Sequence, residues 1–435
     1  EDFFTTLPFS PTNAQRRAVG QAFTDLCGGS RMNRLLQGDV GSGKTLVAAA
    51  CAWLAVQNGK QAVIMAPTEL LARQHKATME KFLGNLDIPV ELLISAMPAA
   101  EKRRVLARAQ SGEPQVLCGT HALIQNDVEI PNAALIVVDE QHRFGVAQRA
   151  ALNQKTDRGH LLAMSATPIP RTLTLILYGD LDVSVLDELP PGRQPVMTRM
   201  VSEAKRQDMY GFLQKEIDAG GQAYIVCPLV EEGEEGSDKK AATAYIDQLQ
   251  QVLPRLRIGL MHGKLKPAEK EAVMGAFAAG DLDVLVSTTV IEVGVDVPRA
   301  TLMIVENADF FGLSQLHQLR GRVGRGQRQS YCFLMHQAKT ETARERLQTL
   351  CATNDGFKIA ETDLRLRGPG DFFGRRQSGL PGFAIADLAT DMNVLEAAQQ
   401  SAQALLKTDP KLESAPLLAD RVAEVIQKTL ASSMN

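Results

Sequence analysis

Residues 38–45, GDVGSGKT, limit what this chain can fold into more than any other stretch. A short apolar run at 35–36 precedes them and a long apolar segment at 46–56 follows, so the pattern predicts a strand, a glycine-rich loop and a helix. Glycines let successive backbone N–H groups face one anion, and the positive end of the helix dipole adds to the attraction. We therefore expect a nucleoside triphosphate site in which Lys44 reaches the β- and γ-phosphates and Thr45 binds Mg²⁺. A glycine-rich turn that binds nothing is the alternative, and the flanking pattern disfavours it.

Short apolar runs alternate with longer segments of helical pattern along most of the chain. Runs that predict strands lie at 62–66, 90–94, 116–118, 135–138, 161–164, 223–227, 258–261, 284–286, 302–305 and 332–335. Segments that predict helices lie at 14–26, 99–110, 205–219, 268–279 and 313–319. Strands that alternate with helices at this spacing indicate parallel sheets covered by helices on both faces.

A proline-rich segment divides this pattern into two halves. Residues 188–195 hold three prolines and one glycine, which neither a helix nor a central strand tolerates, so we expect a linker. Residues 231–240 hold no apolar residue and predict a solvated loop. From about 339 the pattern becomes mainly helical. The 435 residues are therefore predicted to form two α/β domains, at 1–189 and 190–338, and a helical C-terminal region at 339–435.

The balance of charge and the cysteine pattern exclude several classes of protein. Lys and Arg total 47 against 50 Asp and Glu, so a surface that binds nucleic acid must be local. The six cysteines are scattered without a C-x-x-C pair, which favours reduced thiols in the cytoplasm over a disulfide framework or a zinc site. No apolar run reaches membrane-spanning length and no stretch resembles a signal peptide. We expect a cytoplasmic protein without a membrane partner.

A pair of carboxylates follows one of the predicted strands. Asp139 and Glu140 come directly after the run at 135–138, and the carboxyl end of a parallel strand faces the ligand crevice. Asp139 is therefore predicted to hold Mg²⁺, and Glu140 to polarise the attacking water. The tripeptide at 165–167, SAT, follows another strand but is a weak signal by itself. Gln15, ahead of the phosphate loop, could contact an adenine edge or could be a surface glutamine.

Arginines and glycines gather in the second half of the chain, at 318–326, QLRGRVGRG. Guanidinium groups bind phosphate through two hydrogen bonds and can stabilise charge that develops on a γ-phosphate. A solvated basic loop is the alternative. The arginines concerned are Arg320, Arg322, Arg325 and Arg328. Upstream, residues 287–289 and 294–296 follow a predicted strand and also occupy crevice positions.

Taken in order, these stretches resemble the motif series of the superfamily-two helicases. The series consists of GDVGSGKT, PTELLARQH (67–75), GTHAL (119–123), DEQH (139–142), SAT, STTVIEVGVDVP (287–298) and QLRGRVGRG. It covers residues 15–326, and the combination is highly specific. The resemblance implies two tandem RecA-like domains that bind ATP between them, followed by a helical hairpin and appendage.

Two further stretches narrow the resemblance to one branch. DEQH continues as RFGV at 143–146, and LRGPGDFFG at 366–374 is followed by RQSG at 376–379. The first stretch points to a sub-branch, and the second is similar to the translocation motif of the RecG family, bacterial branch-migration helicases that regress stalled forks and process Holliday junctions. Transcription–repair coupling factors share a relative of this motif, but residues 368–371, GPGD, fit the RecG family better.

The resemblance implies a role for individual residues. The residues implied in catalysis are Lys44, Asp139, Glu140, Gln318 and the arginine fingers Arg322 and Arg325. Those implied in nucleotide binding are Gln15, which reads adenine, and Gly38, Asp39, Val40, Gly41, Ser42, Gly43, Lys44, Thr45, His142 and Asp296. Those implied in DNA binding or coupling are Pro67, Thr68, Arg73, Gly119, Thr120, Thr288, Arg346, Arg367 and Gln377. Thr45 and Asp139 are the implied ligands of the metal.

The resemblance also implies a partner and leaves alternatives open. We expect an ATP- and Mg²⁺-dependent translocase, acting as a monomer on branched double-stranded DNA such as forks and Holliday junctions. A single-stranded DNA-binding protein as a further partner is not readable from the sequence. The RecG family carries an N-terminal wedge domain, and because the chain starts at Glu1 instead of Met we expect it to be a fragment that begins after this domain. The alternatives are a coupling-factor-like translocase that displaces a protein, and a nucleotide-gated clamp without productive hydrolysis.

Overall fold

The structure, a computed structural model, describes residues 2–125, 128–140, 159–166, 181–228, 237–288, 297–337, 340–367 and 392–433. The chain divides into two compact units. One consists of Glu1–Pro168 and Asp180–Ile359 and contains both sheets. The other consists of Ile169–Gly179 and Ala360–Asn435.

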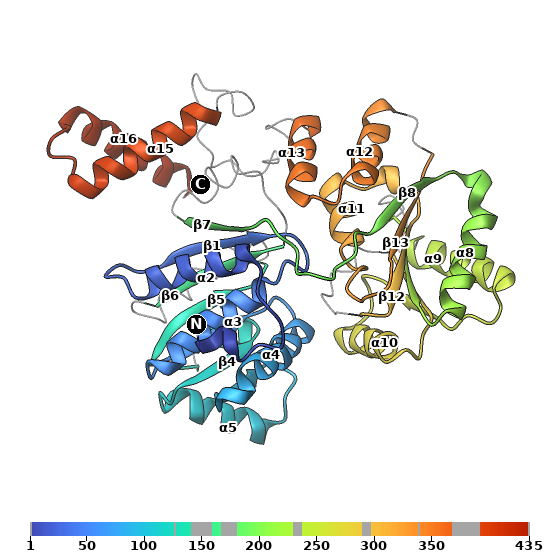
Figure 1. Ribbon diagram of the computed structural model, residues 1–435, viewed down its shortest axis with the longest axis horizontal. Coiled ribbons are helices and arrows are strands. Elements are labelled where there is room, and N and C mark those ends of the chain that lie inside the picture. The colour runs from blue at the N-terminus through green and yellow to red at the C-terminus, as the bar shows by residue number, and fades with distance from the viewer. Residues whose placement is uncertain are drawn as a thin grey trace. The chain divides into compact units, whose positions relative to one another are not determined.

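The first sheet has seven strands in the order β3-β4-β2-β5-β6-β1-β7, and its pairs are parallel (Figure 1). The strands are β1 Asn33–Gly38, β2 Gln61–Met65, β3 Val90–Leu93, β4 Gln115–Gly119, β5 Ala133–Val138, β6 His160–Ser165 and β7 Asp182–Leu186. The helices in the described part of this half are α1 Asp2–Thr5, α2 Asn13–Leu26, α3 Lys44–Gln57, α4 Glu69–Leu83 and α5 Ala99–Gln110, with 3₁₀ turns Gly84–Leu86 and His121–Ile124. Because β1, β6 and β5 are neighbours, the loops that follow them meet at one edge of the sheet.

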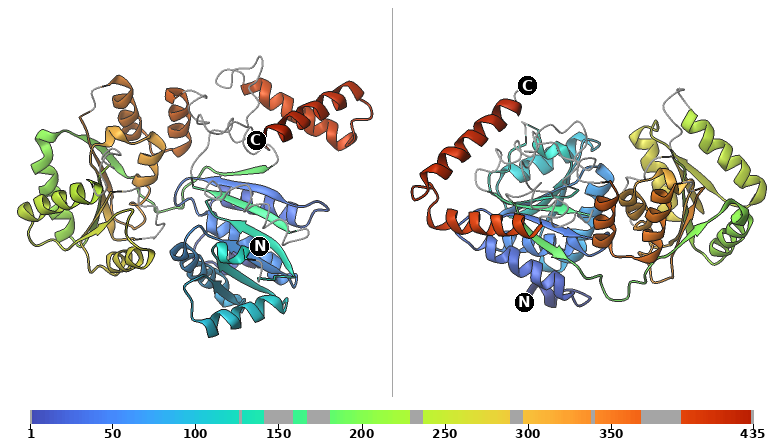
Figure 2. Two further views of the ribbon diagram at one scale, coloured as in Figure 1. Left: turned by 180° about the vertical axis from the view of Figure 1, so that it is seen from behind. Right: turned by 90° about the horizontal axis from the view of Figure 1, so that it is seen from above.

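Alternate residues of each central strand face opposite cores. In β2, Ala62 and Ile64 pack with α2, α3 and α4, whereas Val63 and Met65 pack with α5. This alternation follows from the two-residue period of a strand, and apolar residues at every position show that both faces are buried. The first sheet is therefore covered by helices on both sides (Figure 2).

The second sheet has six strands in the order β10-β11-β9-β12-β13-β8, and its pairs are also parallel. The strands are β8 Met197–Val201, β9 Gln222–Val226, β10 Ile258–Met261, β11 Val284–Ser287, β12 Ala300–Val305 and β13 Tyr331–Met335. One face packs against α8 Arg206–Asp218 and α9 Ser237–Val252. The other face packs against α10 Pro267–Ala279, α11 Leu313–Arg320 and α12 Glu341–Ala352. The 3₁₀ turns Glu203–Lys205 and Ala308–Phe310 also lie among the described residues of this half.

Helices dominate the remainder of the chain. The helix α13 Gly356–Arg367 follows α12, and α15 Met392–Thr408 and α16 Pro416–Ser433 belong to the second compact unit. Within the described ranges, we find no helix that is both long and apolar enough to cross a bilayer.

The predicted fold class is confirmed: two parallel sheets with helices on both faces, followed by helices. The segment between Leu186 and Met197 holds neither helix nor strand, as expected of a linker. The prediction of a loop at 231–240 was wrong for the last four of these residues, which lie in α9. Charged residues without apolar spacing fit the first turn of a helix as well as they fit a loop. The domain boundaries at 189 and 338 stay predictions.

Candidate functional site

The phosphate loop lies between β1, which ends at Gly38, and α3, which begins at Lys44. Gly41 and Gly43 have φ angles of 76° and 85°, a left-handed conformation that glycine adopts without steric cost. A Cβ at position 43 would lie 2.2 Å from Nε2 of Gln15. The loop is therefore shaped by glycine both in its backbone angles and in its packing.

We expect Gly43→Ala to weaken nucleotide binding strongly, because the added Cβ must displace Gln15 from the loop. Gly59→Ala is the matched control, since Gly59 also has a positive φ, 71°, but nothing lies within 4 Å of its Cβ position. Each substitution carries the left-handed penalty of about 1–2 kcal/mol and should lower Tm. Fluorescent ATP binding and a thermal melt separate the two effects. Equal nucleotide affinity in both variants would contradict a packing role for Gly43.

Lys44 is folded against the loop that carries it. Its Nζ donates hydrogen bonds of 2.9 Å to the carbonyl oxygens of Gly38 and Asp39. Burial lowers the pKa of Lys44, and the negative charges of Asp139 and Glu140 oppose that change. An ammonium group in a buried position beside backbone N–H groups is suited to bind a polyphosphate anion.

Gln15 supports the loop from α2. Its backbone N–H donates to the Thr12 hydroxyl, and its Oε1 accepts from the Thr12 N–H, which makes a capping box at the start of the helix. Its Nε2 donates to the Ser42 carbonyl at 2.8 Å. Gln15 is 3% exposed, so the surface alternative considered for it is excluded. Its contact with adenine stays a prediction.

Asp139 and Glu140 leave β5 at the same edge of the sheet as the phosphate loop. Oδ2 of Asp139 lies 2.8 Å from Nε2 of His75 on α4. Burial raises the pKa of Asp139, but the His75 hydrogen bond, the charge of Lys44 and the Glu140 N–H outweigh it and lower the pKa. Glu140 has a φ of 53°, a conformation uncommon outside glycine, and such strain is concentrated at functional sites.

These groups line one cavity of about 250 Å³. The first sheet and its helices contribute the phosphate loop, α4 and the carboxylates, and the second sheet contributes side chains from α11 and the turn after it. The residues are Val40, Gly41, Gly43, Lys44, Thr45, Pro67, Leu71, Gln74, His75, Thr78, Asp139, Glu140, Met164, Ala166, Gln318, Arg322 and Arg325. All six residues implied in catalysis therefore face one space.

The four arginines at 320–328 separate into two pairs. Arg322 and Arg325 line the cavity, and Nε of Arg325 donates to the Gly321 carbonyl at 3.2 Å. Arg320 is 3% exposed and binds carbonyl oxygens inside the protein. Arg328 donates to the Ala219 carbonyl. A role toward phosphate thus fits Arg322 and Arg325, because these two line the cavity and Arg320 and Arg328 do not.

The residues implied in DNA binding occupy varied positions. Pro67 lines the cavity, Thr68 caps α4 by accepting from the Leu71 N–H, and Arg73 is exposed. Gly119 ends β4, and a Cβ there would lie 2.3 Å from the Leu93 carbonyl oxygen. Thr120 and Thr288 are buried, at 1% and 3% exposure. Contact of these residues with DNA stays a prediction.

Arg346 joins α12 to the 3₁₀ turn Ala308–Phe310 by donating to the Asp309 carbonyl at 3.2 Å and to the carbonyl of the following residue, Phe311, at 3.1 Å. The predicted role of Arg346 in DNA binding or coupling stays a prediction. Arg367 is the last residue of α13. Three further predicted site residues, His142, Asp296 and Gln377, lie outside the described residues.

The donor set fits ATP and Mg²⁺. The glycine loop leaves room that a Cβ would fill, and Lys44 supplies the buried cation beside it. In the part of the chain that the structure describes, no group of three His, Cys, Asp or Glu side chains could hold a metal ion. Mg²⁺ is bound in proteins by one or two carboxylates while water and substrate phosphates complete its shell, and Asp139 supplies a carboxylate to the cavity. Thr45 and Asp139 line the same cavity, and their service as metal ligands stays a prediction.

Several residues at or near the site were not predicted from the sequence. Pro67, Thr68 and Arg73 were expected to bind DNA, whereas His75 of the same segment was given no role and contacts Asp139 in the cavity. The signal was available, since Leu71, His75 and Thr78 share one face of a helix capped by Thr68. Arg193 of the linker was not predicted either. Its Nη1 donates to the Val40 carbonyl at 2.5 Å, and its Nε donates to the Gly324 carbonyl at 3.1 Å.

Comparison with known proteins identifies the family. Family models match residues 12–176 (DEAD/DEAH box helicase), 204–327 (helicase conserved C-terminal domain) and 353–432 (ATP-dependent DNA helicase RecG, domain 3, C-terminal). The ATP-dependent DNA helicase RecG of Synechocystis sp. is 50% identical over 434 residues, 100% of this chain. The chain belongs to the RecG family. The predicted resemblance is therefore confirmed.

Other relatives agree with this assignment. The ATP-dependent DNA helicase RecG of Bacillus subtilis is 48% identical over 94% of this chain. A solved structure of RecG bound to a three-way DNA junction superposes with a TM-score of 0.77 and 46% identity, covering 91% of this chain and 51% of that one. This RecG-family chain spans 52% of the Synechocystis protein and 60% of the Bacillus protein.

Proposed function

We propose that the chain hydrolyses ATP in the cavity and uses the energy to move along double-stranded DNA, remodelling forks and Holliday junctions. One observation carries the proposal: Lys44, Glu140 and Arg325, from three separate segments, line the same cavity. A phosphate cradle, a water-orienting carboxylate and a guanidinium from a second sheet are the parts that phosphoryl transfer requires. Family membership supports the use of ATP.

Each residue then has a defined task. Lys44 neutralises phosphate charge, and the backbone N–H groups of the loop hold the phosphate oxygens. Mg²⁺, held through Thr45 and Asp139, would offset negative charge on the phosphates. His75 orients the Asp139 carboxylate through its 2.8 Å hydrogen bond. Glu140 polarises the attacking water.

The proposal that DNA is the partner rests on the relatives of this chain. The solved relative is bound to a three-way DNA junction, which supports branched DNA as the substrate class of this chain. We also propose that the chain acts as a monomer in the cytoplasm; its six free cysteines are compatible with a reducing compartment. A single-stranded DNA-binding protein as a further partner stays open.

A comparison of DNA substrates tests the proposed function. ATP turnover would be measured with forked, duplex and single-stranded DNA at one fixed salt concentration, because phosphate contacts are strongly salt-dependent. We expect forked and duplex DNA to stimulate phosphate release well above single-stranded DNA. A nucleotide-gated clamp would bind DNA without stimulated phosphate release, and that result would contradict the proposal.

A further inference from the structure

A buried hydrogen bond joins the phosphate loop to α11. Oδ1 of Asp39 accepts from the Val40 N–H at 2.6 Å and lies 2.7 Å from Nε2 of His317. The two side chains are 18% and 6% exposed and are separated by 278 residues in the chain. Burial raises the pKa of Asp39, but the His317 hydrogen bond and the Val40 N–H outweigh it and lower the pKa. A carboxylate buried in this way depends on its partners.

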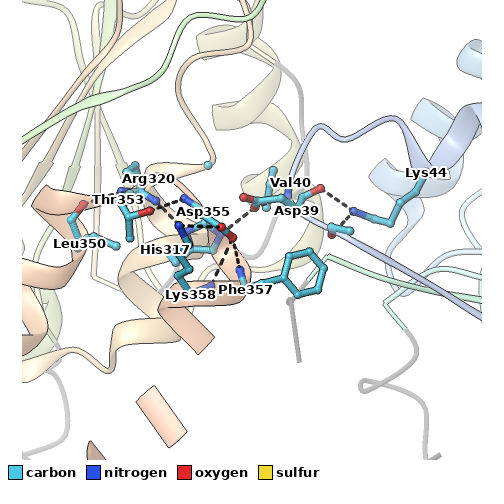
Figure 3. A network of polar contacts seen from close by, with 12 residues as sticks. Asp39, Val40, Lys44, His317, Arg320, Leu350, Thr353, Asp355, Phe357 and Lys358 are labelled. Carbon is cyan, nitrogen blue, oxygen red and sulfur yellow. Dashed lines mark hydrogen bonds and ion pairs between the residues drawn. The ribbon is translucent and has the colours of Figure 1, made fainter. Parts of the chain in front are cut away.

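The second ring nitrogen of His317 settles which nitrogen carries the proton. Nδ1 lies 3.0 Å from Nη2 of Arg320. A guanidinium group only donates, so Nδ1 must accept and Nε2 must donate to Asp39. The imidazole is therefore neutral and bridges a carboxylate and a guanidinium (Figure 3).

Arg320 carries the connection to the end of α12. Its Nη1 donates to the carbonyl oxygens of Leu350 and Thr353 at 2.7 and 2.8 Å. The last carbonyls of a helix lack partners within the helix, and a cation there is favoured by the helix dipole. Arg320 thus fixes the C-terminal end of α12.

The connection continues into the start of α13. The Asp355 N–H donates to the Thr353 hydroxyl at 3.0 Å, and Oδ1 of Asp355 accepts from the N–H groups of Phe357 and Lys358 at 2.9 and 3.3 Å. At the other end, Nζ of Lys44 donates to the Asp39 carbonyl. Figure 3 shows these side chains in one continuous array. The α13 helix ends at Arg367, which the resemblance implies in coupling.

We propose that His317 is a positioning residue that couples the phosphate loop to the turn between α12 and α13. The coupling rests on the proposed function, because it gives nucleotide binding a mechanical effect on the helical hairpin. The two hydrogen-bonding partners at this position favour a histidine side chain. The side chain faces a carboxylate on one side and a guanidinium on the other, so it must donate to the first and accept from the second. A lysine would repel Arg320, and a carboxylate would repel Asp39.

Hydrogen exchange of the full chain tests the coupling at the amides of Asp355, Phe357 and Lys358. It would be measured without nucleotide, and with ADP or a non-hydrolysable ATP analogue. We expect His317→Ala to speed nucleotide-free exchange at these amides roughly tenfold, the factor for the loss of about one hydrogen bond. We also expect it to remove the nucleotide-dependent change that the wild type shows. A change that persists in His317→Ala would overturn the proposal.

Two variants separate a positioning role of His317 from a role of His317 in folding. His317→Gln keeps one acceptor and one donor and should restore the nucleotide-dependent exchange. His160→Ala is the matched control, because the His160 ring accepts a hydrogen bond from the Met32 N–H elsewhere in the first sheet. It should leave exchange at the turn unchanged. A glutamine variant that behaves like the alanine variant, despite an unchanged Tm, would overturn the proposal.

A double-mutant cycle tests whether Asp39 and His317 act together. Because each alanine variant breaks the same bond, the effects of Asp39→Ala and His317→Ala on exchange at the turn should not add. Additive effects would overturn the coupling. Failure of the proposed function can be distinguished from failure of the coupling. If the wild type lacked DNA-stimulated turnover, its nucleotide-free exchange, compared with that of His317→Ala, would still report the effect of the Asp39–His317 hydrogen bond on the turn.

Discussion

Replacing Arg325 with alanine is expected to lower ATP turnover at saturation by about 10³- to 10⁵-fold, with little loss of ATP affinity. Arg325 reaches the cavity from the second sheet, and its positive charge contributes to lowering the pKa of Lys44 on the phosphate loop. A guanidinium in that position acts mainly on charge that develops in the transition state, so its loss appears in kcat instead of in binding.

The measurement combines fluorescent nucleotide binding with single-turnover phosphate release in the presence of duplex DNA. Arg328→Ala is the matched control, since Arg328 follows in the same segment but binds the Ala219 carbonyl and Glu216. The control should keep its turnover within a few-fold of wild type. Much weaker nucleotide binding with normal turnover at saturation would make Arg325 a ground-state contact.

Much of this architecture could be predicted because its signals are local. Apolar runs of two to five residues marked the central strands, and the carboxyl ends of these strands carry the phosphate loop and Asp139. In a parallel sheet those ends share one edge, so proximity followed from the strand type alone. The strands β7 and β8 were not predicted. Each is partly exposed, lies at an edge of its sheet and lacks a continuous apolar run.

Contacts between distant segments could not be predicted in the same way. No local pattern indicates that Asp39 lies beside His317, because the contact depends on how two separately folded sheets meet. The arginine cluster shows the same limit. Arg320 and Arg322 are two residues apart, yet one holds the end of α12 and the other lines the cavity. Spacing along the chain identified the cluster, and only the fold separates its members.

Replacing Lys44 with alanine is expected to reduce ATP hydrolysis below detection, a loss of at least about 10²–10³-fold. The ammonium is the buried cation at the phosphate loop, and its charge is balanced by Asp139 and Glu140. It also bonds the Gly38 and Asp39 carbonyls, so alanine removes contacts within the loop as well as the phosphate contact. A modest fall in Tm should therefore accompany the loss of turnover.

Turnover, nucleotide affinity and thermal unfolding separate these two consequences of Lys44→Ala. Lys60→Ala is the control, because Nζ of Lys60 donates to the Asn132 side chain in an exposed hydrogen bond. That variant should keep wild-type turnover while losing a comparable surface contact. If Lys44→Ala kept near-normal turnover with an intact fold, the triphosphate could not be held by this loop. The roles assigned to Glu140 and Arg325 would then fail with it, because both depend on a γ-phosphate placed at Lys44.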